Sequence, residues 1–557
     1  MRRSVLLIGI FLFLFAIHAN SQNFNSTVER LAGVLKTVQT KSKQYVQHVE
    51  VVQPGVVKVT VEEISKKGKS TVKVYEFNTA DIDENTVRAV AKKDVITVPL
   101  IAHRKQRMIK LTVNQEKISY VDHFVLYAVD INNGREIAEN IKETIPVAKK
   151  IIDERLSIST YPEYLKWLEK SVGDVRLSKK EYIQKLTKNL DYTGNVKFEK
   201  STVTEKSSST ETYVFNLSTL NANEINFDVS GEIFSISVET KAGLKNIKLL
   251  KDGVQKNYIN KFSIVCGNIE QARDIQKVLK EIIPLAGTTF QKSIVRVKKV
   301  SQGVDLFNRA VGTIKTNEVE ITQNFVGNYV LEFNRLTVTD NKTIQESFTY
   351  NLIDIDQSLI GFGNKGQLLF LNVPVTGGEN FIKYVAEGEQ KSYTNALKIY
   401  VPNIEEAIIL KHVLVNMIEI CTAEYKKNSA KPVSETERFK KLQANVKELT
   451  VEDVTYRQEL EIINDGTGLR FKNTTVTEKS DTEELFEVNL ADLDVATVKI
   501  KTSGKNVSVS VTTNLAEKVI QYYEDGEIKA YQKTIEIRAD GIENARSIAG
   551  LLKQILE

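Results

Sequence analysis

The sequence is poor in the residue types on which many catalytic and metal-binding sites depend. It has two cysteines, five histidines, one tryptophan and eight prolines in 557 residues. Two cysteines are too few for a disulfide framework, so we expect Cys266 and Cys421 to be unpaired and buried, with one long-range disulfide as the alternative. With 41% hydrophobic and 26% charged residues, the composition excludes a disordered chain and a collagen-like fibre.

Common catalytic and metal-binding motifs are also missing. The sequence contains no HExxH, no CxxC and no repeated calcium-loop pattern. It also lacks GxSxG and GxxxxGK[ST], the usual signatures of serine hydrolases and NTPases. His103 and His123 could meet across strands, but hydrogen-bonded histidines are the simpler interpretation. We therefore expect a protein that is not an enzyme and has no cofactor.

The sequence has no large excess of basic over acidic residues. Lys and Arg number 76 against 71 Asp and Glu, a formal net charge of +5. This near balance gives no general electrostatic case for a nucleic-acid partner.

The first 21 residues have the pattern of a signal peptide. Two arginines precede an apolar run from Val5 to Ile17, and cleavage is expected after Ser21, with Ala19 as the alternative. No later stretch approaches about 18 consecutive apolar residues, the length needed to span a membrane. We therefore expect export by a cleaved signal peptide to the periplasm, the cell envelope or the medium, with an uncleaved anchor as the alternative.

The sequence does contain an internal repeat. It aligns with itself at offsets of 138, 135 and 138 residues, without gaps, from about residue 75 to 145. Positions identical in all four copies include an asparagine and a tyrosine, namely Asn78, Asn216, Asn351 and Asn489, and Tyr120, Tyr258, Tyr393 and Tyr531. We expect structural roles for both sets. The asparagine amides would satisfy backbone groups at a turn, and the tyrosines would pack on a strand face, with sugar or ligand contact as the alternative for the tyrosines.

The repeat predicts four repeat domains after the leader, called repeats 1 to 4 below. Their expected bounds are 23–153, 154–286, 287–428 and 429–557. In each copy, alternating apolar residues predict strands, and a period of 3.6 then predicts one closing helix that ends near Pro146 in repeat 1 and near Pro284 in repeat 2. The expected N-cap residues of these helices are Asp130, Asn268, Asn403 and Gly541.

Each copy is therefore expected to be an α+β domain. It would be a small antiparallel β-barrel or sandwich of six to seven strands closed by a C-terminal helix, with helical connectors between copies and a clear linker at 428–437. This order of elements resembles the pleckstrin-homology-like barrel superfold. The resemblance covers element order only, because Trp167, the one tryptophan, lies in a connector and not in a closing helix. Since that superfold has many unrelated roles, the resemblance implies a fold and no activity.

One basic cluster distinguishes repeat 1 from the other copies. Arg104, Lys105 and Arg107 form a candidate patch for an anionic lipid or glycan, and a solvated turn is the alternative interpretation. The overall expectation is an exported, non-enzymatic interaction or envelope-associated scaffold. Its partner would be an unknown protein or glycan, and any membrane association would be peripheral. The alternatives are binding of an anionic lipid or glycan through repeat 1, and an exported hydrolase with a carboxylate site between domains.

Overall fold

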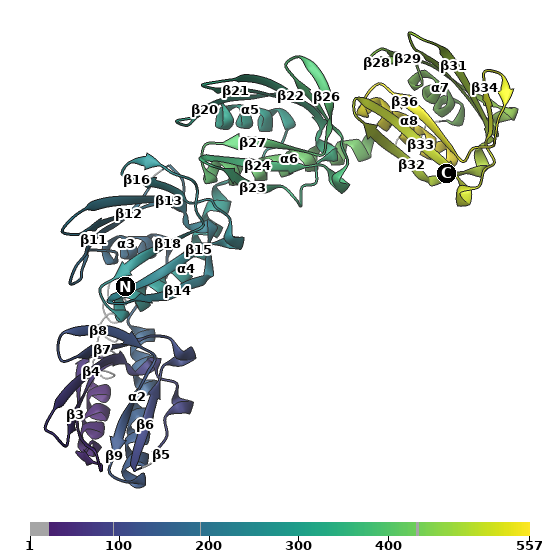
Figure 1. Ribbon diagram of the computed structural model, residues 1–557. Coiled ribbons are helices and arrows are strands. Elements are labelled where there is room, and N and C mark those ends of the chain that lie inside the picture. Colours follow the sequence, from purple (N-terminus) through teal and green to yellow (C-terminus); the bar gives the residue numbers. More distant parts are fainter. Residues whose placement is uncertain (1–21, 93, 157, 190, 430–433) are drawn as a thin grey trace, which may run out of the picture. The chain divides into compact units, whose positions relative to one another are not determined.

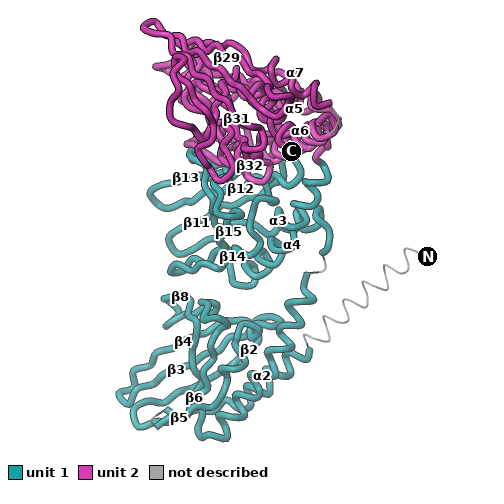
Figure 2. Tube along the Cα trace, turned by 90° about the vertical axis from the view of Figure 1, so that its right-hand side faces the viewer, with its two compact units in different colours: residues 1–293 teal, residues 294–557 magenta. Residues whose placement is uncertain are grey.

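The computed structural model describes residues 22–557 except 93, 157, 190 and 430–433. The predicted signal peptide, residues 1–21, and the middle of the predicted linker lie outside the described residues. The chain forms two compact units that divide after Ser293, called unit 1 and unit 2 (Figure 2). Among the described helices, none is long and apolar enough to cross a membrane.

Each of the four repeats contains a six-stranded and a three-stranded antiparallel sheet (Figure 1). In repeat 1 the strand orders are β1-β2-β3-β4-β7-β8 and β5-β6-β9, and the other repeats follow the same pattern. The prediction of tandem α+β repeats is confirmed. The predicted number of strands was too low, because the described residues of each repeat form nine strands, several of them only two or three residues long, such as Val38–Gln39. Closure of the two sheets into a barrel stays a prediction.

The elements of unit 1 repeat in the same order. Repeat 1 contains β1 (Val38–Gln39), β2 (Lys43–Gln53), β3 (Val56–Ser65), β4 (Ser70–Asn78), β5 (Val90–Lys92), β6 (Val95–Ile101), β7 (Ile109–Val113), β8 (Lys117–Val121), β9 (His123–Ala128) and α2 (Ile131–Glu154). Repeat 2 contains α3 (Tyr161–Ser171), β10 (Val175–Arg176), β11 (Glu181–Lys188), β12 (Asn195–Val203), β13 (Ser208–Asn216), β14 (Leu220–Ser230), β15 (Ile233–Thr240), β16 (Lys248–Lys251), β17 (Val254–Gln255), β18 (Lys261–Cys266) and α4 (Ile269–Ser293).

Unit 2 has the same succession. Repeat 3 contains α5 (Val300–Val311), β19 (Thr313–Lys315), β20 (Val319–Gly327), β21 (Val330–Thr339), β22 (Thr343–Asn351), β23 (Gly361–Lys365), β24 (Leu368–Pro374), β25 (Ile382–Ala386), β26 (Glu389–Thr394), β27 (Ala396–Val401) and α6 (Ile404–Ser429). Repeat 4 contains α7 (Glu435–Asn445), β28 (Leu449–Val451), β29 (Val454–Ile463), β30 (Gly468–Val476), β31 (Asp481–Asn489), β32 (Leu493–Ser503), β33 (Asn506–Thr513), β34 (Gln521–Glu524), β35 (Glu527–Ile528), β36 (Thr534–Ala539) and α8 (Ile542–Leu556).

The helix that precedes each set of strands belongs to a domain core. Helix α3 packs against β11 and against the closing helix α4, and its Leu165 and Leu168 are buried in the core of repeat 2. Residues 22–34 are helical as well, and Phe24 and Leu31 from this segment are buried in the core of repeat 1. These helices are therefore structural parts of the repeats that follow them, beyond the connecting role expected from the sequence.

The predicted ends of the closing helices were wrong. Helix α2 continues through Pro146 to Glu154, and α4 continues through Pro284 to Ser293. A proline inside a helix removes one backbone hydrogen bond and costs about 3 kcal/mol. In each helix, apolar residues beyond the proline are buried, Ala148 in α2 and Phe290 in α4 among them, and their burial favours continued helix.

The predicted helix caps are confirmed. Asp130 accepts a hydrogen bond from the backbone of Asn133, and Asn268 accepts one of 2.8 Å from the backbone of Gln271. Asn403 does the same for α6. In repeat 4 the position holds Gly541, whose φ of 93° lies in the left-handed region that favours glycine.

Replacement of Asn268 tests the cap. Asn268→Ala is expected to lower the free energy of unfolding of repeat 2 by about 0.5–2 kcal/mol, and Asn268→Gly by only a few tenths. Trp167 is the single tryptophan and packs against the core of repeat 2, so its fluorescence during urea unfolding of the full chain reports on this repeat. Equal losses for the two variants would contradict a capping role.

Candidate functional site

The four shared asparagines begin short 3-10 turns. In each, the side-chain oxygen accepts from the backbone N–H two residues later, at 3.0 Å in Asn78, 3.0 Å in Asn216, 3.1 Å in Asn351 and 2.9 Å in Asn489. The turn in repeat 1 is Thr79–Asp81, which follows β4 directly. It places the Asp81 carboxylate three residues beyond the asparagine.

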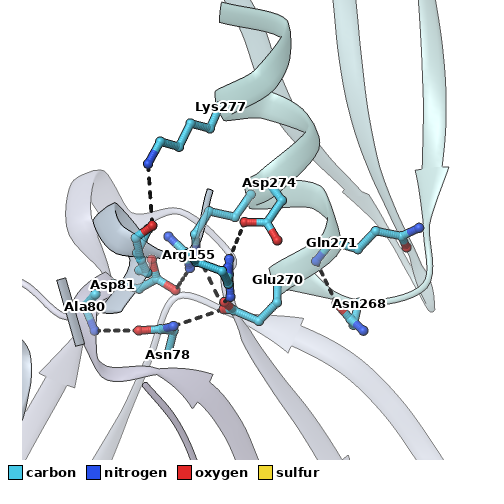
Figure 3. A network of polar contacts seen from close by, with 11 residues as sticks. Asn78, Ala80, Asp81, Arg155, Asn268, Glu270, Gln271, Asp274 and Lys277 are labelled. Carbon is cyan, nitrogen blue, oxygen red and sulfur yellow. Dashed lines mark hydrogen bonds and ion pairs between the residues drawn. The ribbon is translucent and has the colours of Figure 1, made fainter. Parts of the chain in front are cut away.

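In unit 1 this turn meets the start of helix α4 in repeat 2 (Figure 3). The Asn78 amide donates to the Glu270 carboxylate at 3.2 Å, and Arg273 donates to Asp81. Arg155, just after α2, donates to Glu270 at 2.6 Å and also to Asp274. Asp81 and Glu270 are both buried, so repeats 1 and 2 are joined through a charged network that is largely shielded from solvent.

Unit 2 contains the same contact between repeats 3 and 4. The Asn351 amide donates to Glu543 at 3.1 Å, and Arg546 donates to Asp354 at 2.5 Å. In both units the two partners of each bond are 192 residues apart in the sequence. The interface between successive repeats is therefore itself repeated.

An apolar contact accompanies each network. Met108 and Tyr120 of repeat 1 pack against the core of repeat 2, and the Tyr120 ring lies 5.1 Å from that of Phe234. At the equivalent positions of repeat 3, Phe381 and Tyr393 pack against the core of repeat 4. These two shared tyrosines thus contact the next repeat.

Burial controls the electrostatics of the interface. It raises the pKa of Asp81, and the adjacent Arg273 guanidinium opposes that rise. The pKa of Asp354 is raised by burial in the same way, with Arg546 opposing. Burial also raises the pKa of Tyr120 to about 12. The carboxylates here are used in ion pairs that hold repeats together.

A cleft lies beside each interface. The cleft in unit 1 has a volume of about 180 Å³, and the one in unit 2 has about 460 Å³. Both are lined by the shared asparagine, by Lys110 or Lys383, by Tyr120 or Tyr393, and by the first residues of the next closing helix. In unit 2, Lys505 also lines the cleft and is paired with Glu452 at 2.9 Å. Among the described residues, no group of histidine, cysteine or acidic side chains could hold a metal ion.

The basic patch of repeat 1 is exposed. Arg104 and Lys105 lie in the short turn His103–Lys105 with φ angles of 54° and 55°, and Arg107 follows. Corresponding turns in the other repeats have the same left-handed residue, occupied by Ala242, Gly377 and Leu515. The backbone shape is thus shared by the repeats, and repeat 1 differs in having cations at Arg104 and Lys105, where the other repeats have glycine, alanine or leucine.

Two of the remaining reactive side chains lie near these features. His103 belongs to the turn His103–Lys105 and interacts with the Asp81 carboxylate, and Cys266 interacts with the Tyr120 hydroxyl. His123 contacts Asp122, with 2.6 Å between the ring Nδ1 and the carboxylate. Cys266 and Cys421 are both buried and free, as expected, and burial raises the pKa of each thiol to about 12.

Sequence reasoning missed Asp81, Glu270 and Arg273. A signal was available, because the position of Asp81 is also Asp in repeats 3 and 4, and that of Arg273 is also Arg in repeats 1 and 4.

No protein-family model, curated protein or solved structure matches the chain.

Removal of one partner tests the joining role of the network. Arg273→Ala leaves the buried Asp81 without its cation, and the loss of one partner of a buried pair costs about 3–5 kcal/mol. We expect faster amide hydrogen exchange at residues 78–81 of the full chain. Joint replacement by Asp81→Leu and Arg273→Met should recover much of the protection, since apolar residues of similar size often substitute for buried pairs.

The chain offers its own matched control. Arg546→Ala makes the same change in unit 2 and should accelerate exchange at residues 351–354 while leaving 78–81 unchanged. If Arg273→Ala leaves exchange at 78–81 as it is in the unaltered chain, the ion pair does not join the repeats.

Proposed function

We propose that the chain is an exported, non-enzymatic scaffold whose paired repeats present surfaces to protein or glycan partners. The observation that carries this proposal is the recurrence of one interface in both units. The shared asparagine and the Asp and Arg positions are used there to join neighbouring repeats, with the carboxylates bound by guanidinium groups. Charged groups held in this way are poorly placed for proton transfer or nucleophilic attack.

The outer surfaces support the same proposal. Large apolar side chains are exposed in several repeats, for example Val254 in repeat 2, Leu359 in repeat 3 and Ile528 in repeat 4. Rigid pairing of repeats fixes the spacing of such surfaces, and several weak contacts at fixed spacing add through effective concentration.

Photo-crosslinking in the producing cell tests the scaffold proposal. A photoreactive residue is placed in the full chain at one exposed position per repeat, namely Arg104, Val254, Leu359 or Ile528. A scaffold is expected to give discrete adducts at positions in more than one repeat. If the chain is exported by a cleaved signal peptide, the mass of the recovered chain should correspond to cleavage after Ser21.

Two controls separate this outcome from others. Unirradiated cells should give no adducts, and a double variant with Arg273→Ala and Arg546→Ala should give fewer, because its repeats are no longer held at fixed spacing. Absence of adducts at all four positions would overturn the proposal.

A second candidate function rests on the patch of repeat 1. Arg104, Lys105 and Arg107 are all exposed, and no ion pair of theirs is found in the part of the chain that the structure describes. Unpaired exposed cations attract the head groups of anionic lipids. We propose peripheral binding to such lipids as the function of this turn.

Sedimentation with vesicles of phosphatidylglycerol and phosphatidylcholine tests the lipid proposal. The full chain should sediment at low salt and progressively less as salt approaches about 0.15 M, where the Debye length is only about 8 Å. Charge reversal of Arg104, Lys105 and Arg107 should abolish sedimentation. Reversal of Lys241, the first residue of the equivalent turn of repeat 2, together with Lys245, which follows that turn, is the control and should have little effect. If the unaltered chain does not sediment at low salt, the lipid proposal is wrong.

A further inference from the structure

Repeat 4 carries an uncovered copy of the surface that repeats 1 and 3 use to contact the next repeat. We call this the acceptor surface, and it consists of an asparagine, an aspartate, an apolar residue and a tyrosine. These residues are Asn78, Asp81, Met108 and Tyr120 in repeat 1, Asn351, Asp354, Phe381 and Tyr393 in repeat 3, and Asn489, Asp492, Val519 and Tyr531 in repeat 4. In repeat 1 Met108 is 4% exposed. In repeat 4, Val519 is 39% and Tyr531 47% exposed, and Asn489 and Asp492 are exposed as well.

Repeat 1 carries an uncovered copy of the opposite surface. We call it the donor surface, and it consists of the first residues of the closing helix, including an isoleucine and, four residues later, an arginine. In repeats 2 and 4 the isoleucines, Ile269 and Ile542, are each 8% exposed. In repeat 1 Ile131 is 39% exposed, and Val129, two residues before it, is 47% exposed. Arg135 is exposed too, and its contact is with Asn132 on its own helix at 3.3 Å.

The two uncovered surfaces are complementary in charge. On the acceptor surface, the position of Asp81 is Asp in repeats 1, 3 and 4 and Thr219 in repeat 2. On the donor surface, the position of Arg273 is Arg in repeats 1, 2 and 4 and Ile408 in repeat 3. Repeat 4 thus keeps the acidic half of the pair and repeat 1 keeps the basic half. Asn132 stands in place of Glu270, and its amide oxygen can accept from Asn489 as Glu270 accepts from Asn78.

We propose that the acceptor surface of repeat 4 binds the donor surface of repeat 1 in a second copy of this chain. Asp492 pairs with Arg135, Asn489 donates to Asn132, and Val519 and Tyr531 are covered by the second copy. The contact reproduces the interfaces between repeats 1 and 2 and between repeats 3 and 4. Because it joins two different surfaces, it is heterologous and generates rings or open-ended assemblies. This inference rests on the proposed scaffold function and names one of its partners.

Sedimentation velocity of residues 22–557 over a range of concentrations tests the assembly. The chain is expected to form species larger than dimers as concentration rises. Asp492→Ala with Tyr531→Ala, or Arg135→Ala with Ile131→Asp, should each weaken association by about tenfold or more, since each removes one partner of a charge pair together with apolar contact. Arg309→Asp, at an exposed arginine of repeat 3, is the control and should associate normally.

Mixing and rescue show which surfaces meet. A mixture of the chain lacking the acceptor surface with the chain lacking the donor surface retains one functional junction, so it should stop at dimers. A chain carrying both Asp492→Arg and Arg135→Asp should regain association, because the charges are exchanged and still opposite.

The outcomes separate this inference from the function it rests on. Monomers at every concentration, or association that the paired variants leave unchanged, would overturn self-assembly. Monomers together with a photo-crosslink from position 531 to another protein would overturn self-assembly and leave the scaffold proposal standing. Monomers with no crosslink at position 531 or at any of the positions 104, 254, 359 and 528 would overturn both.

Discussion

Burial of an aspartate against an arginine is the constraint on which the arrangement of repeats within each unit depends. Removing two charges from water is costly, and the mutual attraction compensates only when the geometry is good and the remaining polar atoms are satisfied. The Asp81 and Arg273 side chains meet directly, and Arg273 also lies 3.5 Å from Glu270, which Asn78 and Arg155 bind in turn. The buried Nε of Arg273 has no hydrogen-bond partner among the described residues, so the satisfaction of the network is incomplete. A buried pair adds little net stability over apolar residues, but it penalises every arrangement in which the two charges fail to meet. We therefore expect the pair to specify how one repeat lies on the next.

Local backbone features place the two charges. On one side, the Asn78 amide begins a 3-10 turn at the end of a strand and fixes Asp81 three residues later. On the other, Asn268 caps helix α4, so that Arg273 and Glu270 lie in its first two turns. The asparagine performs two tasks, because its oxygen accepts from the turn and its nitrogen donates to the next repeat. This double use gives a physical reason for an asparagine rather than an aspartate at the position.

The repeat, its α+β class and the helix caps could be predicted from the sequence because each is a local or periodic pattern. The strand number could not, since strands as short as Val175–Arg176 exist only through their pairing with longer neighbours. The passage of α2 and α4 through proline depends on burial of residues such as Ala148, which periodicity does not reveal. The interface was missed because Asp81 and Arg273 are far apart in the sequence and resemble ordinary surface charges. A comparison of the four repeats at the positions of Asp81 and Arg273 could have indicated the interface.

The unbroken closing helix also limits how the sequence can change. Helix α2 runs for 24 residues from Ile131 to Glu154 and ends next to Arg155, which binds Glu270 and Asp274 of repeat 2. Each residue of an α-helix turns the chain by about 100° and advances it by about 1.5 Å. Insertion of a single residue in the second half of α2 would point Arg155 away from its partners, whereas an insertion in a hairpin loop would leave the helix in phase. Length variation in this protein is therefore expected to be confined to its strand connections.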